Sequence, residues 1–289
     1  MAERALDKRA VRRAFGRAAA TYDEHAALQR EVGRRLLEHL DPIRIAPERV
    51  VDLGCGTGLF FGALRERYPG ARVVAIDAAL PMLRAASART PWWRRPFAAS
   101  PLLACADAER LPLASGCAQF VWSNLMLQWC DAQALFSEVA RLLQAGGLLL
   151  FSTYGPDTLK ELRTTFASVD DGAHVNTFVD MHDLGDALVG CGFADPVMEM
   201  ETITLEYPDV AALARDLRGG GGHTVLRGRP RGLGGRERWR SMVERYEKLR
   251  RDGALPATYE IVYGHAWKAV PRKTADGRSI VDFQPRIRR

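Results

Sequence analysis

The segment Val50–Gly58, which reads Val-Val-Asp-Leu-Gly-Cys-Gly-Thr-Gly, constrains the fold of this chain more than any other stretch. Two apolar residues lead into Asp52, and three glycines then alternate with other residues. This order predicts a buried strand that runs into a glycine-rich turn and opens a helix. Glycines leave the backbone of such a turn bare, so that a ligand can lie against it.

A second acid follows at the end of the next predicted strand, where Val73–Ile76 leads into Asp77. Strand, glycine turn, helix, strand and acid together form the front half of a nucleoside-binding α/β unit. A carboxylate at this place suits the two hydroxyls of a ribose, because it accepts two hydrogen bonds. The alternative is a glycine-rich turn that binds no ligand.

The spacing of the turn is Gly-x-Gly-x-Gly after an acid, whereas the dinucleotide fingerprint is Gly-x-Gly-x-x-Gly. It resembles motif I of the class I S-adenosylmethionine (SAM) methyltransferases. The resemblance implies SAM as cofactor, S-adenosylhomocysteine as product, and an acid beside the adenine, for which Asp107 is the candidate. The residues expected at the cofactor are Asp52, Gly54, Cys55, Gly56, Gly58, Asp77, Ala78, Met82, Asp107, Ala108 and Asn124.

Strands and helices alternate beyond the turn, and the predicted strands are continuously apolar. This pattern predicts an α/β fold: a seven-stranded, mostly parallel sheet with helices on both faces, as in the class I enzymes. Two helices, over 6–20 and 23–40, are expected to form an N-terminal cap. The last two strands, 198–207 and 258–269, are expected to pair as a hairpin with about fifty residues inserted between them.

These elements divide the chain into a cap over residues 1–45 and a methyltransferase domain over 46–270. Within the domain, 155–195 and 208–256 are expected to form a substrate-side lid and insertion, and 271–289 a basic tail. The charge is uneven: residues 215–289 hold 19 Lys/Arg against 8 Asp/Glu, and residues 1–214 hold 22 against 27. A basic region favours an acidic partner, although an arginine-rich solvated surface is the alternative.

Composition narrows the class of protein further. The chain has 289 residues, of which 47% are hydrophobic and 26% charged, as in ordinary globular proteins. No apolar run reaches the ~18 residues of a membrane span, and charges from residue 3 onward speak against a secretory signal. The five cysteines and six histidines show no metal-ligand spacing. We therefore expect buried reduced thiols, no metal, no membrane contact and a cytoplasmic location.

The loop Ser123–Trp129 follows the fourth predicted strand, beside the switch point where ligands bind in parallel sheets. It contains no His, Lys or Glu to act as a base, and a carboxylate substrate needs none because it is ionised at pH 7. Tyr22, Gln128 and Trp129 are candidates for positioning that substrate, and His174 is a fourth candidate, although each could be structural. The motifs of nucleobase amino and cytosine carbon methylation are absent, which argues against a nucleic-acid partner.

Five stretches resemble the malonyl-acyl-carrier-protein O-methyltransferases (BioC family) of biotin synthesis. They are Phe15–Asp23, Ser123–Trp129, His174–Phe178, Gly228–Arg236 and Tyr259–Trp267. The resemblance covers about residues 10–268. One departure is Gly220-Gly221-Gly222-His223, where the family has an Ile-Gly-Ala-His-like stretch. The four glycines of the run Gly219–Gly222 are expected to loosen the junction of the lid helix.

The resemblance implies that the chain methylates the free carboxylate of malonyl carried on acyl carrier protein, which primes pimeloyl synthesis. Acyl carrier protein is acidic, so a basic rim would steer it. The contacts expected for it are Arg12, Arg13, Arg227, Arg229, Arg231 and Arg236. Alternatives are a carboxyl methyltransferase of a small free acid, of the trans-aconitate type, a methyltransferase-fold assembly factor without methyl transfer, and an RNA methyltransferase.

Overall fold

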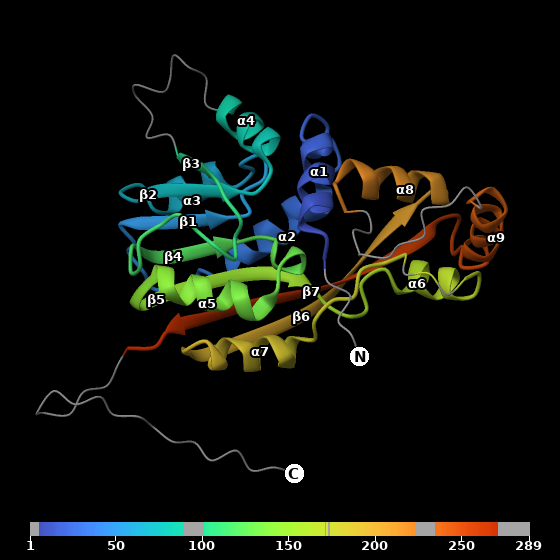
Figure 1. Cartoon of the computed structure of the whole chain (residues 1–289). Helices are drawn as coiled ribbons and strands as arrows, with labels where there is room; N and C mark the ends of the chain where they lie inside the picture. Colours follow the sequence, from blue (N-terminus) through green and yellow to red (C-terminus); the bar gives the residue numbers. More distant parts are fainter. Residues whose placement is uncertain (1–5, 90–100, 171, 173, 223–234, 271–289) are drawn as a thin grey trace, which may run out of the picture.

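The computed structural model describes residues 6–89, 101–170, 172, 174–222 and 235–270. Within these residues the chain forms a seven-stranded sheet of order β3-β2-β1-β4-β5-β7-β6 (Figure 1). The first five strands of this order are parallel, and β7 runs antiparallel to both β5 and β6. The mostly parallel sheet and its terminal hairpin confirm the predicted fold class. The strands are β1 Arg49–Leu53, β2 Arg72–Asp77, β3 Leu102–Cys105, β4 Ala118–Ser123, β5 Leu143–Tyr154, β6 Phe193–Tyr207 and β7 Leu255–Lys268.

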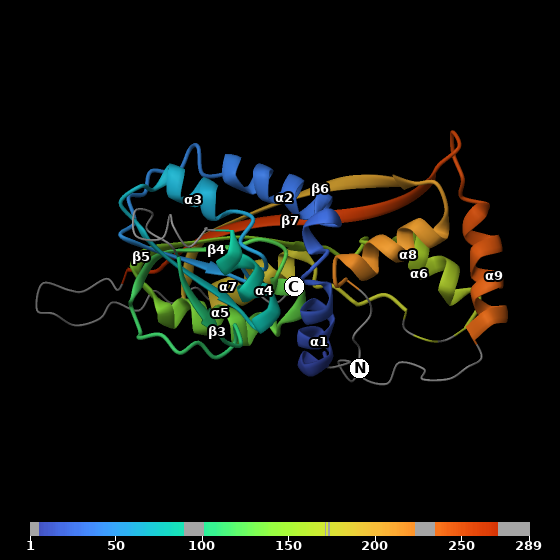
Figure 2. The same ribbon diagram turned by 90° about the horizontal axis from the view of Figure 1, so that it is seen from above.

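Helices cover both faces of the sheet, as Figure 2 shows edge-on. On one face α2 and α3 bury Leu36 and Leu64 against Trp122 of β4. On the other face α5 and α7 bury Phe136 and Leu188. The helices are α1 Lys8–Ala18, α2 Ala27–Glu38, α3 Phe61–Arg67, α4 Leu80–Ala88, α5 Ala132–Leu142, α6 Lys160–Ala167, α7 Met181–Gly190, α8 Val210–Gly219 and α9 Gly235–Glu247, with 3-10 turns η1 Tyr22–Glu24 and η3 Leu127–Trp129.

The hairpin of β6 and β7 reaches beyond the other strands, and α6, α8 and α9 gather around its far end (Figure 1). Leu213 of α8 and Tyr246 of α9 are buried there with Tyr207 and Leu255 of the hairpin. These side chains belong to the same apolar cluster as the α2–α3 face. The insertion between β6 and β7 is therefore packed onto the sheet domain through a continuous core.

Strand β6 is longer than the sequence predicts, since it begins at Phe193 rather than near Met198. Its pairing with β7 shifts between Ala194 and Val197, and Asp195 has a φ of 50°. Pro196 lies within this irregularity. A proline and a bulge are tolerated because β6 is the edge strand, and they hide the regular alternation on which the prediction depended.

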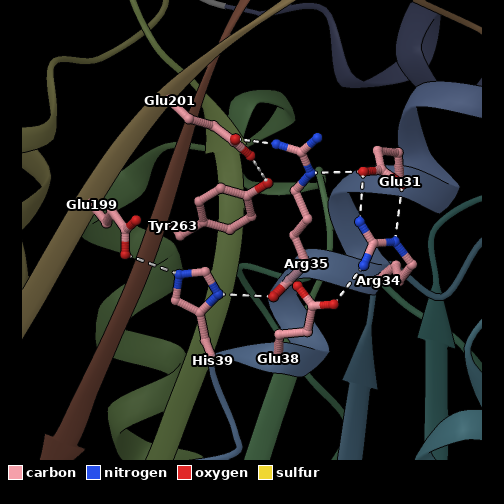
Figure 3. Close-up of polar contacts among 8 residues, drawn as sticks. All are labelled: Glu31, Arg34, Arg35, Glu38, His39, Glu199, Glu201 and Tyr263. Atoms are coloured by element: carbon pink, nitrogen blue, oxygen red, sulfur yellow. Dashed lines mark hydrogen bonds and ion pairs between the residues drawn. The ribbon is translucent and has the colours of Figure 1, made fainter.

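Polar contacts join α2 to the hairpin (Figure 3). The ring of His39 stacks on Tyr263 with centroids 4.7 Å apart, and its Nε2 lies 3.2 Å from a carboxylate oxygen of Glu199. Arg35 pairs with Glu201, which also accepts a hydrogen bond from the Tyr263 hydroxyl. These partly exposed groups fix α2, and with it the cap, against β6 and β7.

The predicted helix over 23–40 is wrong at its start, because η1 and α2 are separate elements. The side chain of Asp23 accepts a hydrogen bond from the Thr57 hydroxyl (2.6 Å) and pairs with Arg89. Asp23 is therefore tied to the glycine turn, and the helix starts only at Ala27.

The expectation of buried thiols is wrong for Cys105. The five are free; Cys55 is buried, Cys105 is exposed and the others are partly buried. Cys105 is exposed because it ends β3, the opposite edge of the sheet, where Leu102 is also 65% exposed. In the described part of the chain, no helix has the length and apolar character needed to cross a membrane.

Candidate active site

The glycine turn follows β1, and hydrogen bonds hold it against the carboxyl end of β2. The backbone N–H groups of Gly54 and Cys55 donate to the carbonyl of Ile76 at 2.8 and 3.0 Å. Gly54 has a φ of 78°, and a Cβ at this position would lie 2.2 Å from the Met126 side chain. Glycine is required here both by the left-handed backbone and by the close approach of the loop after β4.

Asp77 organises this turn from the end of β2. Its carboxylate accepts the backbone N–H of Gly56 at 3.0 Å and that of Ala79 at 2.7 Å. Burial raises the pKa of Asp77, and these two hydrogen bonds oppose that rise. Each carboxylate oxygen has a further lone pair, and the residue lines a pocket, so a ligand hydroxyl can be bound as well.

The first pocket lies against the turn and contains most of the residues expected at the cofactor. Those that line it are Gly54, Gly56, Asp77, Ala78, Met82, Asp107, Ala108 and Asn124. Asp52, Cys55 and Gly58 do not line it. Asp52 lies buried at the end of β1, where burial and the neighbouring Asp77 raise its pKa to about 8.

Helix α1 closes the far end of this pocket through an ion pair that the sequence analysis missed. The Lys8 ammonium lies 2.8 Å from one carboxylate oxygen of Asp107 and 2.5 Å from Glu109. Burial raises the pKa of Asp107, but the Lys8 hydrogen bond and the Glu109 N–H lower it below its usual value. The ion pair keeps Asp107 charged and holds α1 over the pocket.

The residues present fit SAM. Asp77 offers a carboxylate for ribose hydroxyls, and the bare glycine turn allows close approach of a ligand. Leu53, Met82 and Ala108 provide apolar walls for a purine, with the charged Asp107 beside them as an acceptor for its amino group. The described residues form no cluster of three or more His, Cys, Asp or Glu that could hold a metal.

A second pocket adjoins the first, and the two share Phe15, Tyr22, Leu125 and Trp129. The Phe15 and Trp129 rings meet edge-on with centroids 5.3 Å apart. Burial, followed by the nearby Asp77 and Asp23, strongly raises the pKa of Tyr22, so its phenol stays protonated. The shared wall is therefore aromatic, with one neutral hydroxyl that can donate.

Gln128 and His174, two further predicted residues, line the second pocket, but their side chains are hydrogen-bonded to other groups of the protein. The Gln128 amide donates to the carbonyl of Leu125 at 2.7 Å and accepts from the Thr153 hydroxyl at 3.2 Å. The His174 ring stacks on Phe166 with centroids 3.9 Å apart. Its Nε2 lies 2.7 Å from Asp170. In this geometry Gln128 holds the loop after β4, and His174 holds the segment before Asn176.

The glycine run at the end of α8 packs against the cap. A Cβ on Gly219 would lie 2.1 Å from the His25 ring, and one on Gly221, whose φ is 72°, would lie 2.8 Å from Phe15. The His25 Nδ1 is also 3.0 Å from Asp216 of α8. The lack of side chains on these glycines permits a close contact between α8 and the cap.

The arginines expected at a carrier protein are only partly placed. Arg12 and Arg13 are exposed on α1, and Arg12 also lines the first pocket. Arg227, Arg229 and Arg231 lie outside the described residues, as does the side chain of Arg236.

The sheet order, the glycine turn and the paired pockets define a class I SAM-dependent methyltransferase, and comparisons with known proteins agree. Residues 51–151 match a family model described as "Methyltransferase domain". The crystal structure of the YcgJ protein from Bacillus subtilis superimposes with a TM-score of 0.58, covering 82% of this chain and 99% of that one at 15% identity. At that identity the likeness shows the fold alone.

Sequence comparison identifies the family. A malonyl-[acyl-carrier protein] O-methyltransferase from Gallionella capsiferriformans is 51% identical over the full length of both chains. One from Laribacter hongkongensis is 54% identical over 96% of each. The chain belongs to the malonyl-[acyl-carrier protein] O-methyltransferase family, which confirms the resemblance found in the sequence. SAM is accordingly its cofactor.

Proposed function

We propose that this enzyme transfers the methyl group of SAM to the free carboxylate of malonyl-acyl carrier protein. The product is the malonyl methyl ester that primes pimeloyl synthesis in biotin biosynthesis. The names of full-length relatives support this substrate. The observation that carries the proposal is the second pocket, which meets the cofactor pocket at Phe15, Tyr22, Leu125 and Trp129.

The residues at this junction suit transfer to a carboxylate. SAM, when bound, supplies a methyl group activated by a positively charged sulfur. A malonyl carboxylate is ionised at neutral pH, so the chain needs no base to activate it. Phe15 and Trp129 exclude water from the carboxylate, and the protonated Tyr22 hydroxyl donates a hydrogen bond that orients it.

We further propose that Gln128 acts through the loop it holds, and His174 through the segment it anchors, rather than by touching the substrate. The carrier protein contacts Arg12 and Arg13, which are exposed on α1, and also Arg227, Arg229, Arg231 and Arg236, whose side chains lie outside the described residues. Rim charges act mainly on the rate of association and on its salt dependence. We expect the enzyme to work in the cytoplasm, and neither nucleic acid nor metal has a part in the reaction.

The test is methyl transfer from labelled SAM to four acceptors: malonyl-acyl carrier protein, malonyl-coenzyme A, free malonate and bulk RNA. The proposal predicts label on the carrier-protein form, in a linkage that alkali cleaves as an ester. Equal activity on free malonate would favour a small-acid methyltransferase instead. SAM binding without transfer to any acceptor would favour an assembly factor.

A further inference from the structure

The second pocket is lined by residues well beyond the aromatic wall that it shares with the first. It begins at the shared aromatic wall and is bordered by α2, by the segment before α7 and by α8. Arg218 and Trp239 also line it, and both are exposed. The remaining lining mixes apolar side chains, such as Leu28, Leu159 and Phe178, with polar ones, such as Gln29 and Asn176. Such a passage suits an extended chain that carries both aliphatic and polar groups.

Two buried side-chain oxygens in this lining lack hydrogen-bond partners among the described residues: Oε1 of Gln29 and Oδ1 of Asn176. Asn176 is only 5% exposed. A buried amide without a partner destabilises a fold, so such groups usually mark a missing ligand or water. Both residues line the same pocket.

The backbones of both residues are held firmly. The carbonyl of Gln29 accepts a hydrogen bond from the Asn124 side chain at 2.9 Å, and Asn124 lines the cofactor pocket. Gln29 is therefore tied to the residues around the cofactor. Asn176 follows His174, whose ring is held by Phe166 and Asp170. Two unpartnered amide side chains on anchored segments thus border the passage that leads away from the junction.

An unpartnered side-chain oxygen needs a hydrogen-bond donor, and this favours the pantetheine arm of the substrate over its malonyl carboxylate as the bound group. A carboxylate only accepts hydrogen bonds, so it gives an amide oxygen nothing to bind. The pantetheine arm that carries an acyl group has an amide a few bonds beyond the thioester sulfur, and a second amide further on. Each offers an N–H and a carbonyl, which pair with an Asn or Gln side chain in either orientation of its amide.

We propose that Gln29 and Asn176 form a subsite for the amides of a pantetheine arm, so that the enzyme selects thioesters of this arm over free malonate. This inference rests on the proposed function for the identity of the acyl group, but not for the recognition of the arm. Asn176 and Gln29 are specificity-determining residues in this account.

The test pairs two variants with two substrates. Asn176→Leu and Gln29→Met keep approximate size and remove the amide. The substrates are malonyl-N-acetylcysteamine, which has one arm amide, and the malonyl butyl thioester, which has none. In the wild type, we expect a kcat/KM about tenfold higher for the amide substrate, as one buried hydrogen bond allows. At least one variant should lose that preference while its kcat/KM for the butyl thioester changes less than about twofold.

Gln133→Met is the matched control, since Gln133 lies on α5 and lines neither pocket. It should keep the wild-type preference. An equal fall for both substrates in Asn176→Leu and Gln29→Met would overturn the proposal, because it would indicate a purely structural role.

A binding measurement separates this inference from the proposed function. Pantetheine has the arm but no carboxylate, so calorimetry on the S-adenosylhomocysteine complex reports the arm subsite even if no malonyl thioester is methylated. Binding to the wild type that weakens about tenfold in Asn176→Leu would support the subsite. No binding to the wild type, or equal binding to the variant, would overturn it.

Discussion

Replacing Asp77 by alanine is expected to weaken SAM binding by about 1–3 kcal/mol. Hydrogen bonds to a charged group contribute about 1.5–3 kcal/mol each, and a ribose offers two hydroxyls. The range lies below their sum because two hydrogen bonds to one carboxylate, which already accepts the N–H groups of Gly56 and Ala79, are not additive. The range corresponds to a rise in Kd of about 5- to 150-fold.

Calorimetric titration with S-adenosylhomocysteine measures this change, and thermal unfolding without ligand checks the fold. Asp77 also holds the turn through the N–H groups of Gly56 and Ala79, so Asp77→Asn, which keeps one acceptor, should give an intermediate Kd. Asp41→Ala is the matched control, since Asp41 pairs only with Arg67 among the described residues and lines neither pocket. A wild-type Kd for Asp77→Ala would mean that the ribose is held elsewhere.

Three smaller changes test other parts of the site. Lys8→Met removes the ion pair with Asp107 and should weaken SAM binding by up to about 1 kcal/mol, a small loss because the pair is partly exposed. Calorimetry should show that this loss of affinity shrinks at high salt. A loss that does not depend on salt would contradict an electrostatic role for Lys8. Gly221→Ala should lower the melting temperature by several degrees, because the added Cβ would collide with Phe15 of the cap. Gly62→Ala is the control and should not lower it, because a Cβ there has no neighbour within 4 Å. Equal melting temperatures for the two variants would refute the close packing of Gly221. The pKa of Asp52 is raised to about 8, so in the absence of SAM its contribution to stability falls as the pH rises from about 4 to 8. In urea titrations over that range, the Asp52→Asn variant should therefore lose stability less steeply than the wild type. Parallel curves for the two proteins would contradict the raised pKa of Asp52.

The α/β body could be predicted from the sequence because its evidence is local. Val50–Gly58 and Asp77 combine apolar strands with glycines whose backbone angles no other residue adopts easily. Strand order then follows from the rules of parallel sheets, and β1 indeed lies between β2 and β4.

The substrate side could not be predicted in the same way. No local sequence pattern distinguishes Gln29. We single it out only because its side-chain oxygen has no partner among the described residues and because it lines a pocket formed by elements distant in the sequence. Lys8 reaches Asp107 across 99 positions of the chain, and nothing local in the sequence indicates that contact. Likewise, nothing local in the sequence indicates that the glycines at the end of α8 pack closely against His25 and Phe15.

The most direct test of the central claim is the mass of intact malonyl-acyl carrier protein after incubation with the enzyme and SAM. We expect a gain of one methyl group, located on the malonyl moiety and removed by mild alkali. Heat-treated enzyme and acetyl-acyl carrier protein, which has no free carboxylate, should give no gain. An unchanged mass with active SAM binding, or a methyl group located on the carrier protein itself, would contradict it.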